Sequence, residues 1–292
     1  MSSQSVRAVT RVVQAHSQHE GAGFTVRRPI PTVGLEQVDP FLLVDELGPI
    51  SYSPGQAVGA PDHPHRGFET VTYVLEGESA HEDSAGHKGF IGAGDVQWMT
   101  AGAGIVHSEM PSVRMQQAGG RMHGFQVWVN LPKRDKLMAP RYQEVPKAKI
   151  PVATSDDGKA TVRVIAGQAL GVSAVIETRT PILYHHWSLE PGARVQQPVP
   201  SAFNVFAYVF AGEVSIAGRV IRDGQMAMLG PGEVVELSTE PGAPQAAQLL
   251  LLGGVPLREP MVRYGPFVMN TQDELAQAFA DFQSGKMGEI SR

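Results

Sequence analysis

The sequence contains no cysteine. Disulfides, cysteine-ligated iron–sulfur clusters and thiolate metal sites are therefore excluded, and any metal must be held mainly by histidine and carboxylate side chains. Charged residues are also few, at 18% of the chain, and the formal net charge is −5. Because lysine and arginine form no basic stripe or arm, direct binding to nucleic acid is disfavoured.

Long apolar runs are missing as well. No stretch reaches the roughly 18 consecutive apolar residues that indicate a transmembrane helix. Residues 1–17 also lack the apolar core of a secretory signal. We therefore expect a cytoplasmic protein without a membrane partner, and we take a monomer as the default oligomeric state.

Glycine and proline are plentiful, at 32 and 22 of the 292 residues. From residue 63 to about residue 131, short apolar stretches recur between glycine-containing turns, and the same rhythm resumes near residue 160. Each stretch is too short for a stable helix, which is typical of an antiparallel barrel or sandwich. Residues 131–151 are charged and rich in proline, and we interpret them as a connector between two halves.

The C-terminal segment differs from the rest of the chain. Leu275, Phe279 and Phe282 recur at helical spacing, and either Asn270 or Thr271 can cap the first turn. The pattern predicts a helix over residues 272–284 that ends at a glycine.

The chain also contains an internal repeat. Residues 63–78 align with residues 198–213, and residues 92–99 resemble residues 230–237. Aromatic residues and a Gly-Glu turn occupy matching positions in both copies. The repeat predicts two related β-domains in tandem, which we assign to residues 1–140 and 141–292.

Several potential metal ligands occur in only one copy of the repeat. The alignment pairs them as follows: His63 with Pro198, His65 with Pro200, Glu69 with Asn204, His107 with Gln245, and Glu109 with Ala247. If these side chains served the fold, the second copy would need them too. We therefore infer that they serve a function confined to the first domain.

The spacing of these residues favours a metal site. Residues two apart in a strand point to the same face, so the pairs His63/His65 and His107/Glu109 can each aim two ligands into one barrel. Three imidazoles and one carboxylate suit a divalent transition metal such as iron(II), manganese, nickel, copper, cobalt or zinc. Glu69 shares the parity of His63 and is a rival for the carboxylate position. An octahedral metal would keep two positions open for substrate or dioxygen.

The other histidines are interpreted as structural. We expect hydrogen-bonded or packed roles for His81, His87 and His123. His185 and His186 are adjacent, so they point to opposite faces of a strand and make poor co-ligands.

Three stretches closely resemble the pirin family of the cupin superfamily: "HPHRGFETVTYVLEG" (63–77), "HEDSAGHKGFIGAGDVQWMTAGAGIVHSEMP" (81–111) and the terminal "GPFVMNT" (265–271) with the residues that follow. The resemblance implies an all-β chain of two tandem cupin barrels of the double-stranded β-helix type, with a short C-terminal helix. It implies one iron in the N-terminal barrel and a metal-free C-terminal barrel. Matched by motif, the ligands are His63, His65, His107 and Glu109, and Glu69 becomes a pocket residue.

The resemblance also implies a function. Pirins and related bicupins are associated with quercetin 2,3-dioxygenase activity, in which a flavonol ring is opened by dioxygen and carbon monoxide is released. Glu109 or Glu69 would then act as the general base toward the substrate hydroxyl. The alternative is a regulatory protein that acts through protein partners and is tuned by the redox state of its metal. An enzyme requires a cavity of roughly a few hundred cubic ångströms beside the metal, whereas a regulatory protein does not.

Overall fold

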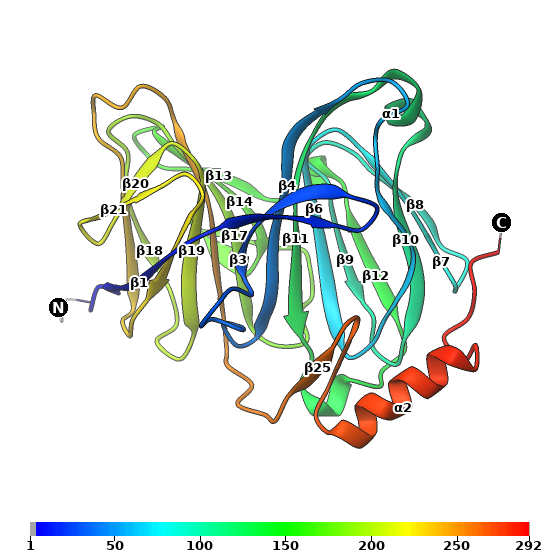
Figure 1. The fold of residues 1–292 in the computed structure, drawn as a ribbon. Coiled ribbons are helices and arrows are strands. Elements are labelled where there is room, and N and C mark those ends of the chain that lie inside the picture. The colour runs from blue at the N-terminus through cyan, green and yellow to red at the C-terminus, as the bar shows by residue number, and fades with distance from the viewer. Residues whose placement is uncertain (1–3, 292) are drawn as a thin grey trace. The chain divides into compact units, whose positions relative to one another are not determined.

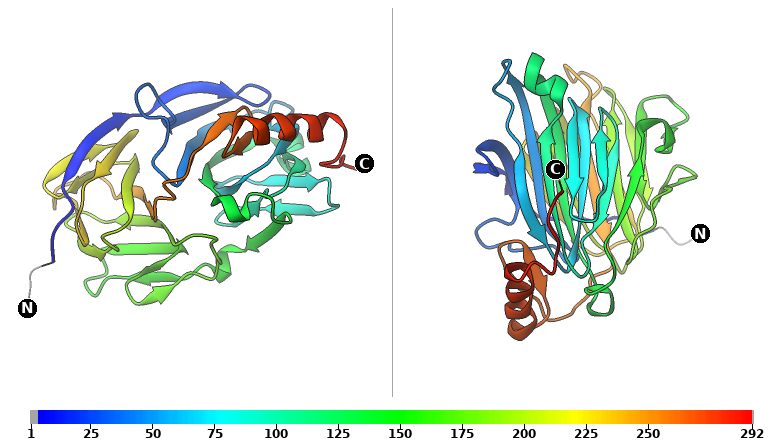
Figure 2. Two further views of the ribbon diagram at one scale, coloured as in Figure 1. Left: turned by 90° about the horizontal axis from the view of Figure 1, so that it is seen from below. Right: turned by 90° about the vertical axis from the view of Figure 1, so that its right-hand side faces the viewer.

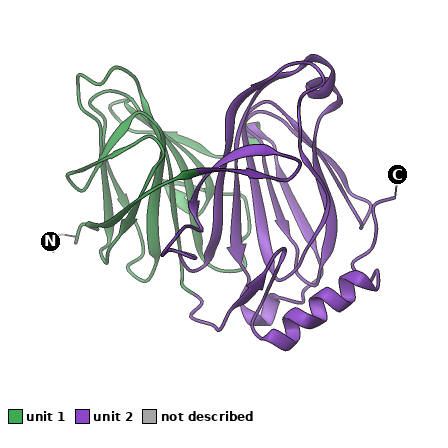
Figure 3. Cartoon of the chain, viewed as in Figure 1, with its two compact units in different colours: residues 1–16, 148–256 green, residues 17–147, 257–292 purple. Residues whose placement is uncertain are grey.

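The computed structural model describes residues 4–291. The chain forms two compact units of antiparallel strands, shown in Figure 3 in separate colours. We call them the first barrel, which contains residues 17–147 and 257–291, and the second barrel, which contains residues 4–16 and 148–256. The predicted all-β fold of two cupin domains is confirmed.

Two sheets make up the first barrel. The seven-stranded sheet has the order β12-β9-β6-β11-β4-β3-β2, and the four-stranded sheet has the order β5-β10-β7-β8. The seven strands are β2 (His16–Glu20), β3 (Phe24–Ile30), β4 (Phe41–Tyr52), β6 (Phe68–Glu76), β9 (Val96–Thr100), β11 (Gly120–Asn130) and β12 (Arg141–Val145). The other four are β5 (Ala60–His65), β7 (Ser79–Asp83), β8 (Lys88–Ile91) and β10 (Ile105–Pro111), and a short helix, α1 (Val113–Ala118), follows β10.

The second barrel has the same strand order. Its sheets run β1-β22-β19-β24-β17-β14-β13 and β18-β23-β20-β21. The seven strands are β1 (Val9–Gln14), β13 (Val152–Thr154), β14 (Ala160–Ala166), β17 (Ile182–Leu189), β19 (Asn204–Ala211), β22 (Gln225–Leu229) and β24 (Ala247–Gly254). The other four are β18 (Arg194–Pro198), β20 (Glu213–Ile216), β21 (Arg219–Arg222) and β23 (Val234–Ser238), with a small hairpin of β15 (Gln168–Ala169) and β16 (Val172–Ser173). The matching order supports the internal repeat.

Each end of the chain belongs to the barrel that is formed mainly by the other half of the sequence. Strand β1, dark blue in Figure 1, pairs with β22 and so completes the second barrel. Residues 257–291 belong to the first barrel, and β12, within the expected connector, pairs with β9. The compact units therefore differ from the expected division into residues 1–140 and 141–292, because long-range strand pairing outweighs position along the chain.

The C-terminal segment, residues 257–291, forms a hairpin and a helix on the first barrel. The hairpin consists of β25 (Val262–Tyr264) and β26 (Phe267–Met269), and the helix is α2 (Gln272–Gln283), which lies across one end of the strands (Figure 2). The Thr271 hydroxyl accepts a hydrogen bond from the Glu274 backbone N–H, and the Glu274 carboxylate accepts one from the Thr271 N–H. This reciprocal cap satisfies backbone donors at the helix start. The helix predicted over residues 272–284 is confirmed.

Two buried basic side chains, Lys136 and Arg66, connect this segment to the loop that follows His65. The Lys136 ammonium donates hydrogen bonds to the Gly67 carbonyl at 2.8 Å, to the Asn130 side-chain oxygen at 2.7 Å and to the Val268 carbonyl at 2.9 Å. Arg66 forms an ion pair with Asp281 of α2 at 2.9 Å. All three ammonium donors are satisfied, which offsets the cost of burying the charge. The loop between β5 and β6 is therefore fixed from both sides.

The interior of the second barrel is apolar and contains one buried histidine. His185 lies on β17 two residues from the buried Trp187 and is fully buried. Neither of its ring nitrogens has a hydrogen-bond partner among the described residues. Burial lowers the pKa of His185 to about 3. His186 points to the other face, where it lies 3.0 Å from the Gln248 side chain. Within residues 4–291, no helix is both long and apolar enough to cross a membrane.

The buried His185 predicts a specific loss of stability in acid. Between its unfolded pKa of about 6.5 and its folded pKa of about 3, only the unfolded chain binds a proton there. The free energy of unfolding then falls by about 1.4 kcal/mol per pH unit as the pH drops through this window. In the metal-free protein, His185→Leu should remove this dependence. Its stability relative to wild type should rise by about 2 kcal/mol from pH 7 to pH 5.

Urea denaturation at several pH values measures this difference. The exposed His16→Ala variant is the control and should follow the wild-type pH dependence. A stability difference between His185→Leu and wild type that stays constant from pH 7 to pH 5 would contradict the prediction.

Candidate metal centre

Three histidines meet on two neighbouring strands of the first barrel. His63 and His65 lie on β5, and His107 lies on β10 directly across from His63. The three ring centroids are 4.4 to 4.9 Å apart. One ring nitrogen from each lies within 4.8 Å of those of the other two. The register of the two strands therefore converges three imidazoles on one point, as the spacing of these residues predicts.

The electrostatics of the group fit a cation. His65 and His107 are only 4% and 1% exposed. Burial first, and the neighbouring imidazoles second, hold the pKa of each of these two histidines well below its ordinary range. Both rings are therefore neutral at pH 7 and offer a lone pair. Neither nitrogen of His107 has a hydrogen-bond partner among the described residues, and such buried polar atoms are costly unless a ligand satisfies them.

His63 is oriented by its own strand. Its Nδ1 lies 2.7 Å from the carbonyl oxygen of Pro61. A carbonyl can only accept, so Nδ1 carries the proton and Nε2 keeps the lone pair. Metal-binding histidines are commonly oriented by such a hydrogen bond on the other nitrogen. The fit to a divalent metal therefore rests on three converging imidazoles, of which His65 and His107 are neutral and His63 is oriented by Pro61.

Glu109 lies two residues beyond His107 on β10 and lines the same cavity as His63 and His65. Its carboxylate accepts a hydrogen bond from the Thr72 hydroxyl at 2.8 Å and others from the Gln126 amide at 3.0 and 3.1 Å. The strand register shifts between His107 and Glu109, so the carboxylate is displaced from an ideal i, i+2 position. The converging group consists of the three imidazoles, and Glu109 as the fourth ligand stays a prediction.

Glu69 does not share a face with the histidine pair, contrary to the parity argument. A turn separates β5 from β6, and Gly67 within it has φ +86°. A side chain at Gly67 would place its Cβ only 2.0 Å from the Val268 carbonyl oxygen, so glycine is required there. Glu69 lies on the face of β6 opposite to Thr72 and accepts a hydrogen bond from the Thr100 hydroxyl at 2.6 Å. Its expected role as a base stays an untested prediction.

A cavity of about 560 Å³ opens beside the three histidines. Most of its wall is apolar, and its lining residues come mainly from β3, β4, β5, β6 and β11. The Trp128 ring lies 5.1 Å from the His65 ring and 4.4 Å from the Phe68 ring. The size is that of a typical small-molecule site, and the flat aromatic wall suits a planar ligand.

The other histidines of the first barrel have the hydrogen-bonded roles expected of them. His81 contacts the Tyr142 hydroxyl at 3.0 Å, and its ring lies 5.2 Å from that of His107. His87 is 60% exposed and pairs with Asp83 at 3.1 Å. His123 pairs with the buried Glu46 at 2.9 Å. The position of His81 behind His107 supports the orientation of that ring.

Several residues of the site were not identified from the sequence. The alternation of Phe68, Thr70 and Thr72 along β6 could have indicated a polar inner face. No local signal marks Arg263, which enters the cavity wall from the C-terminal segment. Its contribution depends on a contact between segments far apart in the sequence.

The strand order identifies the counterparts of the histidine-bearing strands in the second barrel and corrects the later part of the sequence alignment. Strands β18 and β23 correspond to β5 and β10 by their order in the sheet. In the second barrel, Leu237 of β23 lies across from Val195 of β18, and Val235 lies across from Gln197. The first barrel pairs His107 of β10 with His63 of β5, and Ile105 with His65, in the same antiparallel manner. Neither β18 (RVQQP) nor β23 (VVELS) contains a histidine, so the second barrel supplies no imidazole from the strands equivalent to β5 and β10.

The misalignment has a simple cause. The hairpin from β20 to β21 is shorter than that from β7 to β8, so the offset between the copies shrinks beyond it. Similar glycine-rich turns at residues 92–95 and 230–233 therefore precede different strands, β9 and β23. Gln245 and Ala247 lie beyond β23, so they are not the structural counterparts of His107 and Glu109.

Comparison with known proteins identifies both barrels. The pirin family model matches residues 23–129, and the model of the pirin C-terminal cupin domain matches residues 184–288. Pirin from Mus musculus is 46% identical over 289 residues, which cover 97% of this chain and 95% of that protein. A pirin-like protein from Solanum lycopersicum is 45% identical over 285 residues, covering 97% and 93%.

Two solved structures are similar to this chain over nearly its whole length. A crystal structure of quercetin 2,3-dioxygenase from Acinetobacter baumannii matches with a TM-score of 0.91 and 35% sequence identity, covering 98% of this chain and all of that one. A second structure with the same name and source has a TM-score of 0.87 at 25% identity. Sequence, fold and strand order agree, and this chain belongs to the pirin family.

Proposed function

We propose that this protein is a metal-dependent dioxygenase that opens the ring of a flavonol such as quercetin, or of a similar hydroxylated aromatic. The observation that carries the proposal is the group of three converging imidazoles, two of which, His63 and His65, line a cavity of about 560 Å³. The likeness to a quercetin 2,3-dioxygenase at 35% identity supports the reaction class. We further propose one iron(II) per chain, although the same ligands suit manganese, nickel, copper, cobalt or zinc.

The metal would be held by His63, His65, His107 and Glu109. When bound, it supplies a Lewis acid and a redox-active centre for the reaction of the substrate with dioxygen. The protein supplies the rest. His63 keeps a fixed tautomer through Pro61, and the aromatic wall at Trp128 orients a planar substrate and excludes water from its face.

The proton of the substrate hydroxyl requires an acceptor. We assign this role to Glu109, because its carboxylate lines the cavity. Thr72 and Gln126 donate hydrogen bonds to it and so fix the orientation of the carboxylate. Glu69 lies on the opposite face of β6, which makes it the weaker candidate for the base.

Removal of one imidazole should abolish tight metal binding. For His107→Ala we expect the affinity for iron(II) to fall by more than about 100-fold, because a direct ligand contributes more than the 10- to 100-fold of an outer hydrogen-bond partner. Anaerobic titration calorimetry and elemental analysis measure the affinity and the metal content. The control is His16→Ala, an exposed histidine outside the cavity, which should keep one metal per chain. Unchanged metal content in His107→Ala would refute the site.

The hydrogen bond to Glu109 offers a test of the fourth ligand. Thr72→Val removes the hydroxyl and keeps the volume, so we expect about 10- to 100-fold weaker metal binding. Thr70→Val is the matched control, since Thr70 lies on the same face of the same strand and is more deeply buried than Thr72. Equal affinities in the two variants would remove Glu109 from the ligand set. Thermal denaturation of both variants separates this effect from a loss of folding.

Turnover is tested directly with the iron-loaded protein and quercetin in air. We expect metal-dependent loss of flavonol absorbance, consumption of dioxygen and release of carbon monoxide. The double variant His63→Ala/His107→Ala, or wild type treated with a chelator, should lose at least about 100-fold of the rate. One metal per chain without consumption of substrate would refute the dioxygenase and favour a regulatory role.

A further inference from the structure

The cavity beside the histidines contains two arginines with very different partners. Arg28 of β3 is bound by two carboxylates. Its guanidinium donates two hydrogen bonds to Asp45, at 2.6 and 2.5 Å, and forms an ion pair with Glu20 at 2.8 Å. The charge of Arg28 is therefore fully compensated from within the protein.

Arg263 of β25 makes no direct ion pair, although Asp45 and Glu20 act on its charge at longer range and raise its pKa against the larger effect of burial. Its Nη1 donates a hydrogen bond to the Leu42 carbonyl at 3.2 Å, and its guanidinium carbon lies 4.9 Å from the centroid of the Trp128 ring. Among the described residues, no carboxylate lies within ion-pair distance of it. A guanidinium offers five N–H donors in a fixed fork, so most of those of Arg263 remain available. Although burial and the nearby Arg28 lower its pKa, an arginine remains charged in proteins.

The position of Arg263 relates it to the metal centre. The Trp128 ring lies 4.9 Å from this guanidinium and 5.1 Å from the His65 ring. One indole therefore contacts both a cation and a predicted metal ligand, and all three residues line the same cavity. A planar molecule attached at the histidines would extend along the cavity wall toward the guanidinium.

The guanidinium is held in place by the fastening of the C-terminal segment. Strand β25 pairs with β26, whose Val268 carbonyl accepts a hydrogen bond from the buried Lys136. The carbonyl of Leu42 on β4 fixes the guanidinium itself. A preorganised cation of this kind binds an anion without a large cost of ordering.

We propose that Arg263 is a specificity residue that selects aromatic substrates bearing a second anionic group, a carboxylate or an ionised phenol, in addition to the oxygen presented to the histidines. The proposal rests on the proposed function, because it takes the cavity to be the substrate site. Guanidinium recognises planar anions in a bidentate manner, and such charge-assisted pairs are strong where water is partly excluded. A substrate anion would supply the direct ion pair that Arg263 lacks, whereas Arg28 already has two.

The test compares two probes that differ by one anionic group: 3-hydroxyflavone and its 4′-carboxylate. Each is titrated anaerobically into the iron-loaded protein, and binding is followed by calorimetry, so no turnover is needed. Wild type should bind the carboxylate at least tenfold more tightly, about 1.4 kcal/mol. Arg263→Gln should remove this preference and change the affinity for 3-hydroxyflavone by less than threefold. Arg263→Lys should keep part of the preference, since it keeps the charge without the fork.

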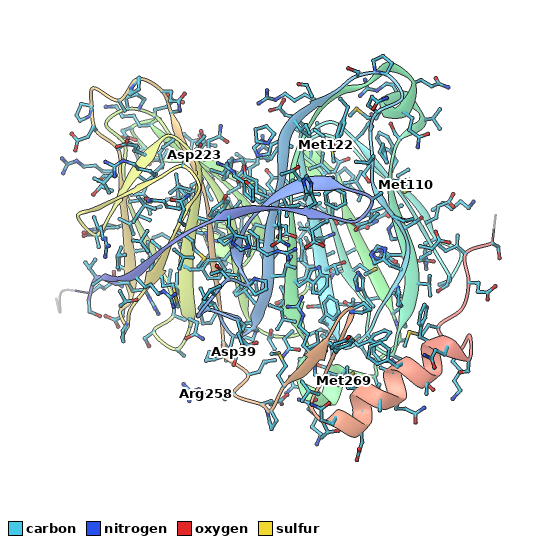
Figure 4. All side chains as sticks on the ribbon, viewed as in Figure 1. Asp39, Met110, Met122, Asp223, Arg258 and Met269 are labelled. Carbon is cyan, nitrogen blue, oxygen red and sulfur yellow. The ribbon has the colours of Figure 1, made fainter. Side chains whose placement is uncertain are left out.

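Arg258→Gln is the matched control. Arg258 lies in the same C-terminal segment, is exposed, and donates its backbone N–H to Asp39, beside which Figure 4 places it. This variant should keep the wild-type preference, and a lost preference there would overturn the assignment to Arg263. Equal binding of both probes by wild type, or a preference that persists in Arg263→Gln, would also overturn the proposal. Absence of turnover with an intact preference would refute the dioxygenase alone, whereas no binding of either probe would refute both.

Discussion

The register between β5 and β10 is the constraint on which the rest of this molecule depends. This register places His107 across from His63, and His65 follows two residues later on β5. The three imidazoles therefore converge on one point. Burial then keeps His65 and His107 neutral, which is the form that binds a cation. A slip of one residue in this pairing would turn the side chains of one strand to the other face, and the three imidazoles would no longer converge.

The second barrel shows that this register is a property of the scaffold, independent of the chemistry. Val195, Gln197 and Leu237 lie on β18 and β23, the strands equivalent to β5 and β10. Two of them join a continuous apolar core, so the same backbone is stabilised by hydrophobic packing where the first barrel places polar rings. Fold and function are therefore separable between the two copies.

Much of the site could be predicted from the sequence because it depends on short-range geometry. The period of a strand places His63 and His65 on one face. The internal repeat separates the potential metal ligands, which occur in one copy, from the residues that serve the fold, which occur in both. The same rule failed for Glu69, because the turn at Gly67 resets the parity between two strands. Arg263 could not be predicted, since its place beside Trp128 arises from the docking of a distant segment. Local periodicity carries no information about such contacts.

The exchange of chain ends has a consequence for biosynthesis. The first barrel lacks its C-terminal hairpin and helix until residues 257–291 have left the ribosome, although its histidines emerge early. Domains ordinarily fold in order as they are synthesised. Until those residues are made, Lys136 lacks the Val268 carbonyl as a hydrogen-bond acceptor, and the cavity wall lacks Arg263. Completion of the wall beside the histidines is thus coupled to the synthesis of residues 257–291.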